Sequence, residues 1–197
     1  MATKFEYGKS YLLKMLRQNS GSAKEINTKR WDFIKEICPE VKTVLDYGCG
    51  CNYLSAFAPE DVEVDSYDIG EYCGVHYPQT GITRDNYEVA CFFDSLEHVD
   101  WKESLDSKML YVVGISDYVI VSVPILPPGK SLDETWRHYK PTEHLTYFTE
   151  STLEKFFNDL GFELVTMNAI ECPPRCDITT FAFKKNIPSW TVKDNAR

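Results

Sequence analysis

Apolar positions along the chain follow two periodicities, and the change between them separates a helical N-terminus from a strand-rich remainder. Residues 8–18 repeat apolar side chains at helical spacing. Residues 23–37 also predict an amphipathic helix, with these candidate buried positions: Ile26, Trp31, Ile34 and Ile37. We therefore expect an N-terminal helical cap over residues 1–37, followed by an α/β core over residues 41–186.

The core alternates strand-like and helical patterns. Strands are predicted at residues 41–48, 62–68, 87–94, 117–126, 163–170 and 177–185. Helices are predicted within 100–113 and 148–162, the second with Thr149 as N-cap and Gly161 as its stop. This alternation favours a mostly parallel sheet with helices on both faces.

Two parts of the core depart from simple alternation. The last two strands have no helix between them, which predicts an antiparallel hairpin at the sheet edge. Glycines and prolines interrupt residues 69–86, so we expect a shortened third βα unit there: a loop, with at most a brief strand near residues 81–84.

Length and charge narrow the classes of function. A chain of 197 residues with 43% apolar residues suits one domain, residues 1–197. A net charge of −9 makes nucleic-acid binding unlikely, although residues 1–37 hold eight basic and four acidic residues. The sequence has neither an apolar signal core nor a run of membrane-spanning length. Its seven cysteines lack C-x-x-C spacing, so we expect a reduced, cytoplasmic protein and assign no metal site.

Polar residues stand where three of the predicted strands end. Asp46 ends the first strand, Asp68 ends the second, and Asp94 ends the third and is followed by Glu97 and His98. The carboxyl ends of parallel strands share one edge of a sheet, where open α/β folds bind ligands. Asp68 follows Gly48 by twenty residues, the spacing of an acid that binds ribose hydroxyls.

The turn after the first strand restricts the kind of ligand. A dinucleotide turn needs a third glycine where this chain has Tyr53, and the Gly-Lys-Ser/Thr of a phosphate loop is absent. A nucleoside cofactor without phosphates remains. Asn52 follows Gly48 and Gly50 at the next alternate position, and asparagine is the non-glycine residue best able to adopt a left-handed backbone.

Three motifs in order resemble the class I S-adenosylmethionine-dependent methyltransferases. "VLDYGCGCNYL" is similar to their first motif. "YEVACFFDSLEHV" and "PTEHLTYFTESTLEKFFNDLGFELV" resemble the subgroup that includes the ubiquinone-biosynthesis O-methyltransferases. The resemblance covers residues 41–170 and implies a Rossmann-like methyltransferase fold with S-adenosyl-L-methionine as cofactor.

The resemblance also implies roles for individual residues. Asp46 would bind the amino group of the cofactor, Asp68 the ribose hydroxyls, and Ile69 would be an apolar wall for adenine. Phe93 and Asp94 would lie beside the sulfonium and the acceptor. The full set of expected cofactor-binding residues is Asp46, Gly48, Gly50, Asn52, Asp68, Ile69, Phe93 and Asp94.

Catalysis needs in-line positioning and, for a hydroxyl acceptor, a base. We expect His144 to be that base, with His98 and Asp94 as further catalytic candidates and His138 as a third histidine. A histidine ordinarily titrates near neutral pH, which suits this role. The loop 127–147 is rich in aromatic residues and is expected to close over the acceptor.

The sequence therefore favours methyl transfer to an O or N atom of a small molecule. Methylation of a macromolecule docked on the basic N-terminal helices is an alternative, as is an inactive cofactor-binding scaffold of the same fold. A dehydrogenase is disfavoured by Tyr53. The sequence does not indicate the oligomeric state.

Overall fold

The computed structural model describes residues 10, 13–14, 21–70, 79–99 and 107–186. Most of the helix expected over residues 8–18 lies outside these residues. The described helices are α2 (Ala23–Ile37), α3 (Tyr53–Ala56), α4 (Ser107–Gly114) and α5 (Glu150–Asp159), with a short 3-10 helix, η1, at Leu96–His98. The strands are β1 (Thr43–Tyr47), β2 (Glu63–Tyr67), β3 (Tyr87–Phe93), β4 (Ser116–Pro124), β5 (Phe162–Asn168) and β6 (Ile178–Lys185).

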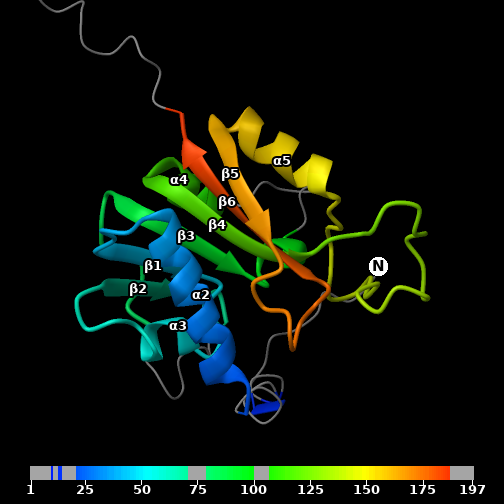
Figure 1. The fold of residues 1–197 in the computed structure, drawn as a ribbon, viewed down its shortest axis with the longest axis horizontal. Coiled ribbons are helices and arrows are strands. Elements are labelled where there is room, and N and C mark those ends of the chain that lie inside the picture. The colour runs from blue at the N-terminus through cyan, green and yellow to red at the C-terminus, as the bar shows by residue number, and fades with distance from the viewer. Residues whose placement is uncertain (1–9, 11–12, 15–20, 71–78, 100–106, 187–197) are drawn as a thin grey trace, which may run out of the picture.

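The six strands form one sheet in the order β2-β1-β3-β4-β6-β5 (Figure 1). The pairs β1–β2, β1–β3 and β3–β4 are parallel. The pairs β4–β6 and β5–β6 are antiparallel, which confirms the C-terminal hairpin with β5 at the edge. The fold is the mixed, Rossmann-like α/β sheet that the sequence predicts.

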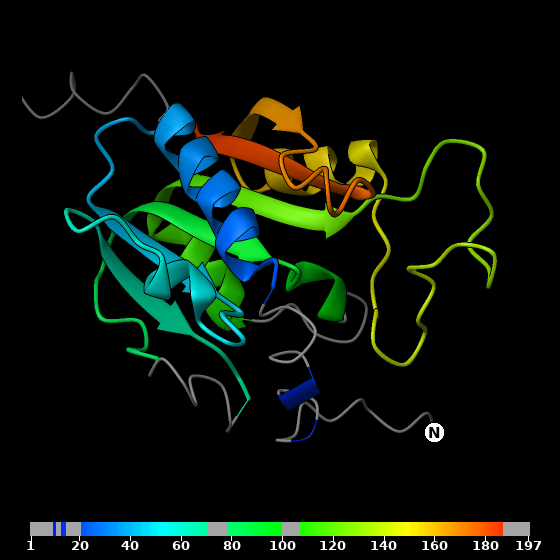
Figure 2. The same cartoon turned by 60° about the horizontal axis from the view of Figure 1, so that its bottom comes forward.

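Alternate residues along the strands bury against helices on opposite faces. Leu45 of β1 and Phe92 of β3 pack with α4 and α5 on one face. Val44 and Val89 pack on the other face with α2, which contributes Ile34 together with Trp31 and Phe33. Figure 1 shows α2 and α3 on the same side of the sheet, and Figure 2 shows the loop 127–147 reaching away from it.

Local capping fixes the helix that follows the long loop. The hydroxyl of Thr149 accepts a hydrogen bond from the backbone N–H of Thr152 at 3.2 Å. The backbone N–H of Thr149 donates in return to the Thr152 hydroxyl at 2.9 Å, which completes a capping box. Gly161 follows the helix with a φ of 84°, as expected for a stop.

The connection between β2 and β3 is short, as predicted, but its brief strand is absent. Residues 79–86 contain neither helix nor strand. The N–H of Gly81 donates to the Ser66 carbonyl at 2.9 Å, and Thr83 binds the Asp65 carboxylate instead of extending a ladder. Side-chain hydrogen bonds thus replace the backbone pairing that a seventh strand would need.

The cysteines differ from the sequence prediction at one pair. Cys172 and Cys176 form a disulfide in the connection between β5 and β6, whereas Cys38, Cys49, Cys51 and Cys91 are free thiols. A turn in which the Arg175 N–H donates to the Glu171 carbonyl at 2.8 Å brings the two cysteines together.

Among the described residues, no helix combines the length and apolar character needed to cross a membrane.

Candidate functional site

The turn after β1 is built from three consecutive alternate residues with positive φ: Gly48 at 81°, Gly50 at 51° and Asn52 at 57°. Asn52 has a ψ of 37°, so it adopts the left-handed conformation predicted for it. The N–H of Gly48 donates to the Tyr67 carbonyl at 2.7 Å, which joins the turn to the end of β2. A Cβ atom on Gly48 would lie 2.5 Å from the Cβ atom of Ser95, so a side chain cannot fit there.

Asp68 directly follows β2 and faces this turn. Its Oδ2 accepts a hydrogen bond from the Gly50 N–H at 2.9 Å, and its Oδ1 accepts one from the Gly70 N–H at 2.8 Å. Each carboxylate oxygen has a second lone pair. Asp68 is therefore held in place by backbone donors and retains acceptor capacity for a ligand.

Asp46 lies at the end of β1, with 4% of its surface exposed. Burial raises the pKa of Asp46 to about 7, the Arg30 guanidinium lowers it in part, and Asp68 raises it further. A cationic ligand group would favour the ionised form. The carboxyl ends of β1, β2 and β3 thus place Asp46, Asp68 and Asp94 along one edge, as the sequence predicts.

Asp94 follows β3 with a φ of 54° and is bound by two arginines. Its Oδ2 accepts hydrogen bonds from Arg175 Nη1 at 2.7 Å and from Arg30 Nη2 at 3.1 Å, and Arg175 Nη2 binds Oδ1. Glu171 completes the cluster, because its two oxygens accept from Arg30 Nε at 2.7 Å and Arg175 Nη1 at 2.8 Å. Burial alone would raise the pKa of Asp94, but the two guanidiniums hold it well below its usual range.

This cluster changes the setting expected for Phe93 and Asp94. The Arg30 guanidinium lies 4.3 Å from the centroid of the Phe93 ring, a cation–π contact. Asp94 does not cap η1, whose N-cap is Ser95. The sequence prediction missed Arg30, Glu171 and Arg175, because no local motif marks them.

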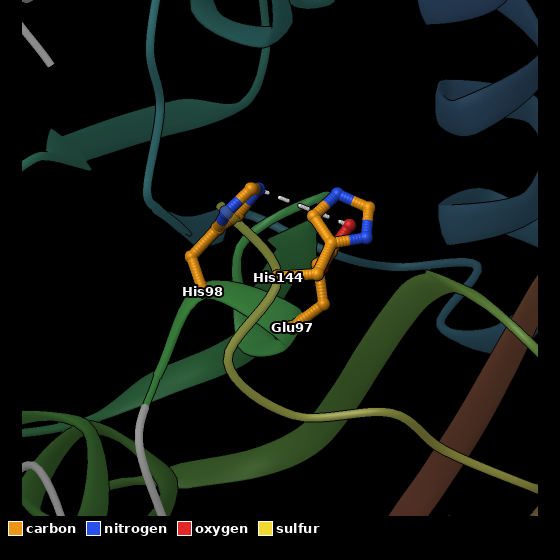
Figure 3. A group of neighbouring side chains, drawn as sticks. All are labelled: Glu97, His98 and His144. Carbon is orange, nitrogen blue, oxygen red and sulfur yellow. Dashed lines mark ion pairs between the residues drawn. The ribbon is translucent and has the colours of Figure 1, made fainter. Parts of the chain in front are cut away.

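Glu97, His98 and His144 converge beside this cluster (Figure 3). Each contributes one candidate metal-ligand atom, and these atoms lie within 4.8 Å of one another. His98 Nδ1 contacts the Glu143 carbonyl at 2.9 Å, and His144 Nδ1 contacts the His138 carbonyl at 2.9 Å. These contacts require a proton on each Nδ1, which fixes the tautomers that present Nε2 as the coordinating nitrogen.

The group fits a divalent cation by two criteria. Two imidazoles and a carboxylate are a common donor set for zinc and other transition-metal ions, and backbone carbonyls orient both rings. Glu97 is 3% exposed, and its Oε2 has no hydrogen-bond partner within the described residues. An orphaned carboxylate oxygen in such a position is stabilised by a cation or a proton.

The electrostatics of His144 bear on the base role expected for it. Burial, together with His98 and Lys140, lowers the pKa of His144 to about 4, so it does not titrate near neutrality. Burial also lowers the pKa of His98. Burial and the neighbouring Asp94 raise the pKa of Glu97 well above its ordinary value. A histidine with so low a pKa is neutral but only weakly basic at neutral pH, and its neutral ring keeps a lone pair for a cation.

The end of the loop 127–147 lies against η1, where the N–H groups of Leu145 and Thr146 donate to the Glu97 carbonyl, and its rings pack edge-on. His98 and His144 meet edge-on with centroids 5.0 Å apart, and Trp136 packs against His138 at 5.5 Å. His138 binds the carboxylate of Asp177 through Nε2. The third candidate histidine therefore orients the loop and does not belong to the metal-binding group.

Comparisons with known proteins identify the family and the fold of the chain. Residues 17–167 match the family described as a methyltransferase domain. No curated protein matches the sequence. The magnesium protoporphyrin IX methyltransferase of Synechocystis PCC 6803, solved with bound SAH, is similar in structure with a TM-score of 0.59 and 17% identity, covering 84% of this chain and 86% of that chain.

Two further solved structures show the breadth of the fold. DesVI of Streptomyces venezuelae has a TM-score of 0.68 and 12% identity, covering 92% of this chain and all of that chain, 100%. The 16S rRNA methylase ArmA has a TM-score of 0.54 and 14% identity, and the match covers 89% of this chain and 91% of that chain. The sheet, the glycine turn and the aspartate edge define a Rossmann-like nucleoside-binding protein. The chain belongs to the methyltransferase-domain family and is a class I S-adenosylmethionine-dependent methyltransferase.

The left-handed backbone at Asn52 generates the first prediction. Asn52→Gly should keep the affinity for S-adenosylhomocysteine, because glycine adopts this conformation freely. Asn52→Val should weaken binding roughly tenfold, since asparagine tolerates a left-handed backbone and a β-branched residue does not, a penalty of about 1–2 kcal/mol. Calorimetric titration measures both affinities, with thermal unfolding to verify that each variant is folded. Equal affinities for the two variants would contradict the assigned turn.

The raised pKa of Asp46 generates the second prediction. In the ligand-free protein the neutral form is favoured, so the stability contributed by this group falls as pH rises toward about 7. A cofactor whose ammonium binds Asp46 requires the ionised form. Its affinity should therefore increase by up to about tenfold per pH unit as pH rises from about 5.5, and level off above about 7.

Calorimetry in buffers of different ionisation enthalpy should detect the proton that is released on binding below about pH 7. Asp46→Asn should bind more weakly at neutral pH and lose the pH dependence. A pH profile that is the same in the wild type and in this variant would exclude Asp46 from the ammonium site.

Proposed function

We propose that the protein transfers the methyl group of S-adenosylmethionine to a hydroxyl oxygen of a small-molecule acceptor. The observation that carries this proposal is the burial of the polar and aromatic side chains at and after the end of β3 and near the end of the loop 127–147. Phe93, Glu97 and His144 are buried there, with exposed fractions of 6%, 3% and 4%. Buried side chains of this kind suit a small-molecule acceptor. They suit an amino-acid residue or a nucleobase within a macromolecule less well.

The cofactor occupies the edge formed by β1 and β2. Gly48 and Gly50 allow its methionine part to approach the backbone, and Asp46 binds its ammonium group. Asp68 accepts hydrogen bonds from the ribose hydroxyls through its remaining lone pairs. Ile69 has an exposed fraction of 70%, and the adenine ring covers it in the complex. Asp94 and Phe93 lie next to the transferred methyl group.

The acceptor binds beside η1, under the loop 127–147. Glu97, His98 and His144 would hold a divalent cation, whose positive charge would favour the ionised form of a bound hydroxyl. The protein positions this group with the Glu143 and His138 carbonyls, which fix both imidazole rings. The aromatic residues of the loop exclude water from the transfer.

Two finer assignments are part of this proposal. The Leu-Glu-His-Val segment at residues 96–99 supports a relationship to the ubiquinone-biosynthesis O-methyltransferase subgroup. Cys38, Cys51 and Cys91 form no disulfide, which supports a cytoplasmic protein, where reducing conditions keep thiols reduced.

Asp68 provides a direct test of the cofactor position. Asp68→Ala should weaken S-adenosylhomocysteine binding by tenfold or more, since hydrogen bonds to charged groups contribute about 1.5–3 kcal/mol. Asp85→Ala removes an exposed acid from the same connection and is the matched control. Calorimetry on the folded variants measures the difference. Unchanged affinity in Asp68→Ala would remove this residue from the site.

The metal-binding group provides a second test, independent of the acceptor. Titration with Co²⁺, followed by visible absorption, should show one saturable site in the wild type. Glu97→Gln and His144→Gln should each weaken it by about tenfold or more, because losing even an indirect contact to a metal site often costs that much. Glu143→Gln leaves the carbonyl that holds His98 in place and should bind Co²⁺ normally. Absence of saturable binding in the wild type would refute the cation site.

A further inference from the structure

The connection between β5 and β6, residues 169–177, forms one wall of the acceptor side of the site. Glu171 in this connection is fully buried and accepts hydrogen bonds from Arg30 of α2 and from Arg175. Arg175 in turn binds both oxygens of Asp94. The connection therefore links α2 to the carboxyl end of β3 through charged groups of which Glu171 is fully buried and the others are partly buried.

Asp94 depends on these contacts. It is a non-glycine residue with a left-handed φ of 54°, a conformation that the surrounding structure must enforce. Its carboxylate is only partly exposed, and the Arg175 and Arg30 guanidiniums are its cationic partners. Displacing Arg175 would leave Asp94 with Arg30 at 3.1 Å, the longer of its hydrogen bonds. Arg175 is thus a positioning residue for the group next to the transferred methyl.

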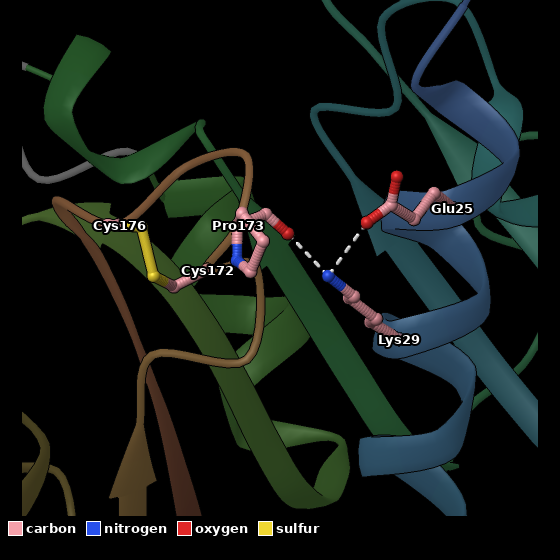
Figure 4. Close-up of a disulfide and its surroundings, with 5 residues drawn as sticks. All are labelled: Glu25, Lys29, Cys172, Pro173 and Cys176. Atoms are coloured by element: carbon pink, nitrogen blue, oxygen red, sulfur yellow. Dashed lines mark hydrogen bonds and ion pairs between the residues drawn. A yellow bond between two sulfur atoms is a disulfide. The ribbon is translucent and has the colours of Figure 1, made fainter.

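The disulfide closes the turn that carries Arg175. Cys172 follows Glu171 directly and Cys176 follows Arg175, so the bond between them fixes both members of the ion pair relative to each other. Figure 4 shows the disulfide beside Pro173, whose carbonyl binds Lys29 of α2, and Lys29 also pairs with Glu25 at 2.9 Å. The position of Arg175 therefore follows from the closed turn.

The same connection also holds the loop 127–147. Asp177, next to Cys176, binds His138 and Arg137 of that loop. The carbonyl of His138 accepts the Nδ1 hydrogen of His144 at 2.9 Å. Opening the turn would consequently act on both sides of the acceptor position, through Arg175 on Asp94 and through Asp177 on the loop.

Both cysteines of this disulfide are exposed, whereas Cys49 and Cys91 are buried thiols. Exposed disulfides are open to thiol–disulfide exchange, and they are more often labile or regulatory than structural. The loop that the bond closes spans a sequence separation of only four residues. Such a short loop restrains the unfolded chain less than a long one, so the main effect of the bond is local.

We infer that the Cys172–Cys176 disulfide is a redox switch that controls the acceptor side of the site by positioning Arg175 and Asp177. This inference rests on the proposed function for its account of the acceptor. Reduction by a dithiol breaks the S–S bond; two electrons and two protons pass to the cysteines, which become thiols, and the reductant becomes a cyclic disulfide. Glutathione disulfide reverses the step, forming the protein disulfide and two molecules of glutathione.

The test compares oxidised and dithiothreitol-reduced protein by hydrogen–deuterium exchange and by calorimetry with S-adenosylhomocysteine. Reduction should raise exchange in residues 127–147 and 94–98 at least severalfold and change the cofactor affinity less than twofold. Alkylation and mass measurement should count two additional thiols after reduction. Glutathione disulfide should restore the slow exchange.

Three variants separate the switch from general loosening. Cys172→Ser/Cys176→Ser should exchange like the reduced protein and no longer respond to dithiothreitol. Cys38→Ser, which removes a thiol outside the connection, should respond like the wild type. Arg175→Ala should raise exchange near Asp94 in the oxidised protein, and Arg175→Lys should restore it in part.

The outcomes distinguish the inference from the proposed function. Equal exchange of residues 127–147 and 94–98 in the two redox states, or failure to detect the two additional thiols, would overturn the inference. Loss of S-adenosylhomocysteine binding in every state would count against the proposed cofactor site and leave the exchange comparison decisive for the switch. Once an acceptor is known, reduction of the disulfide should raise the KM for the acceptor more than the KM for the cofactor.

Discussion

The pairing of Asp94 with two arginines is the interaction on which the site depends. The carboxylate follows β3, Arg30 comes from α2 and Arg175 comes from the β5–β6 connection, so three separate parts of the chain meet at one partly buried charge. Glu171 balances the arginines with a fully buried carboxylate. Removing one member of this network is destabilising, because the remaining charges, the fully buried Glu171 above all, lose their partners. The sheet and the helix on it are thereby fixed relative to the site.

The two halves of the site are built by different means. The cofactor half is local: the turn containing Gly48 and Asn52 follows β1 directly, and Asp68 reaches it from the neighbouring strand through the Gly50 N–H. The proposed acceptor half would draw on distant segments, namely η1, the loop 127–147 and the β5–β6 connection. Gly48 joins the halves, because its missing side chain makes room for Ser95 just before η1. Because the cofactor half is built from neighbouring residues, a change in the distant segments can alter acceptor binding without disturbing cofactor binding.

The sequence predicted the parts whose causes are local. Apolar periodicity located every described strand of the sheet, and asparagine at a position that needs a left-handed backbone was recognisable from its chemistry. The charge cluster could not be predicted, since Arg30 and Glu171 are 141 residues apart and no spacing rule relates them. The disulfide was missed because a turn brings Cys172 and Cys176 together at a spacing that is not a recognised motif. The low pKa of His144 depends on burial, which a single sequence does not reveal.

The asymmetry between two neighbouring acids explains the character of the acceptor half. Asp94 receives both arginines, which hold its pKa well below the usual range. Glu97, three residues later, is buried against Asp94 and has no hydrogen-bond partner for Oε2 among the described residues, so its pKa is raised. Burial penalises the Glu97 charge, and only a proton or a nearby cation relieves that penalty. Two neutral imidazoles lie beside Glu97, so this carboxylate favours a positive charge at the proposed acceptor position. Arg30 and Arg175 cannot supply that charge, because Asp94 and Glu171 already bind both guanidiniums.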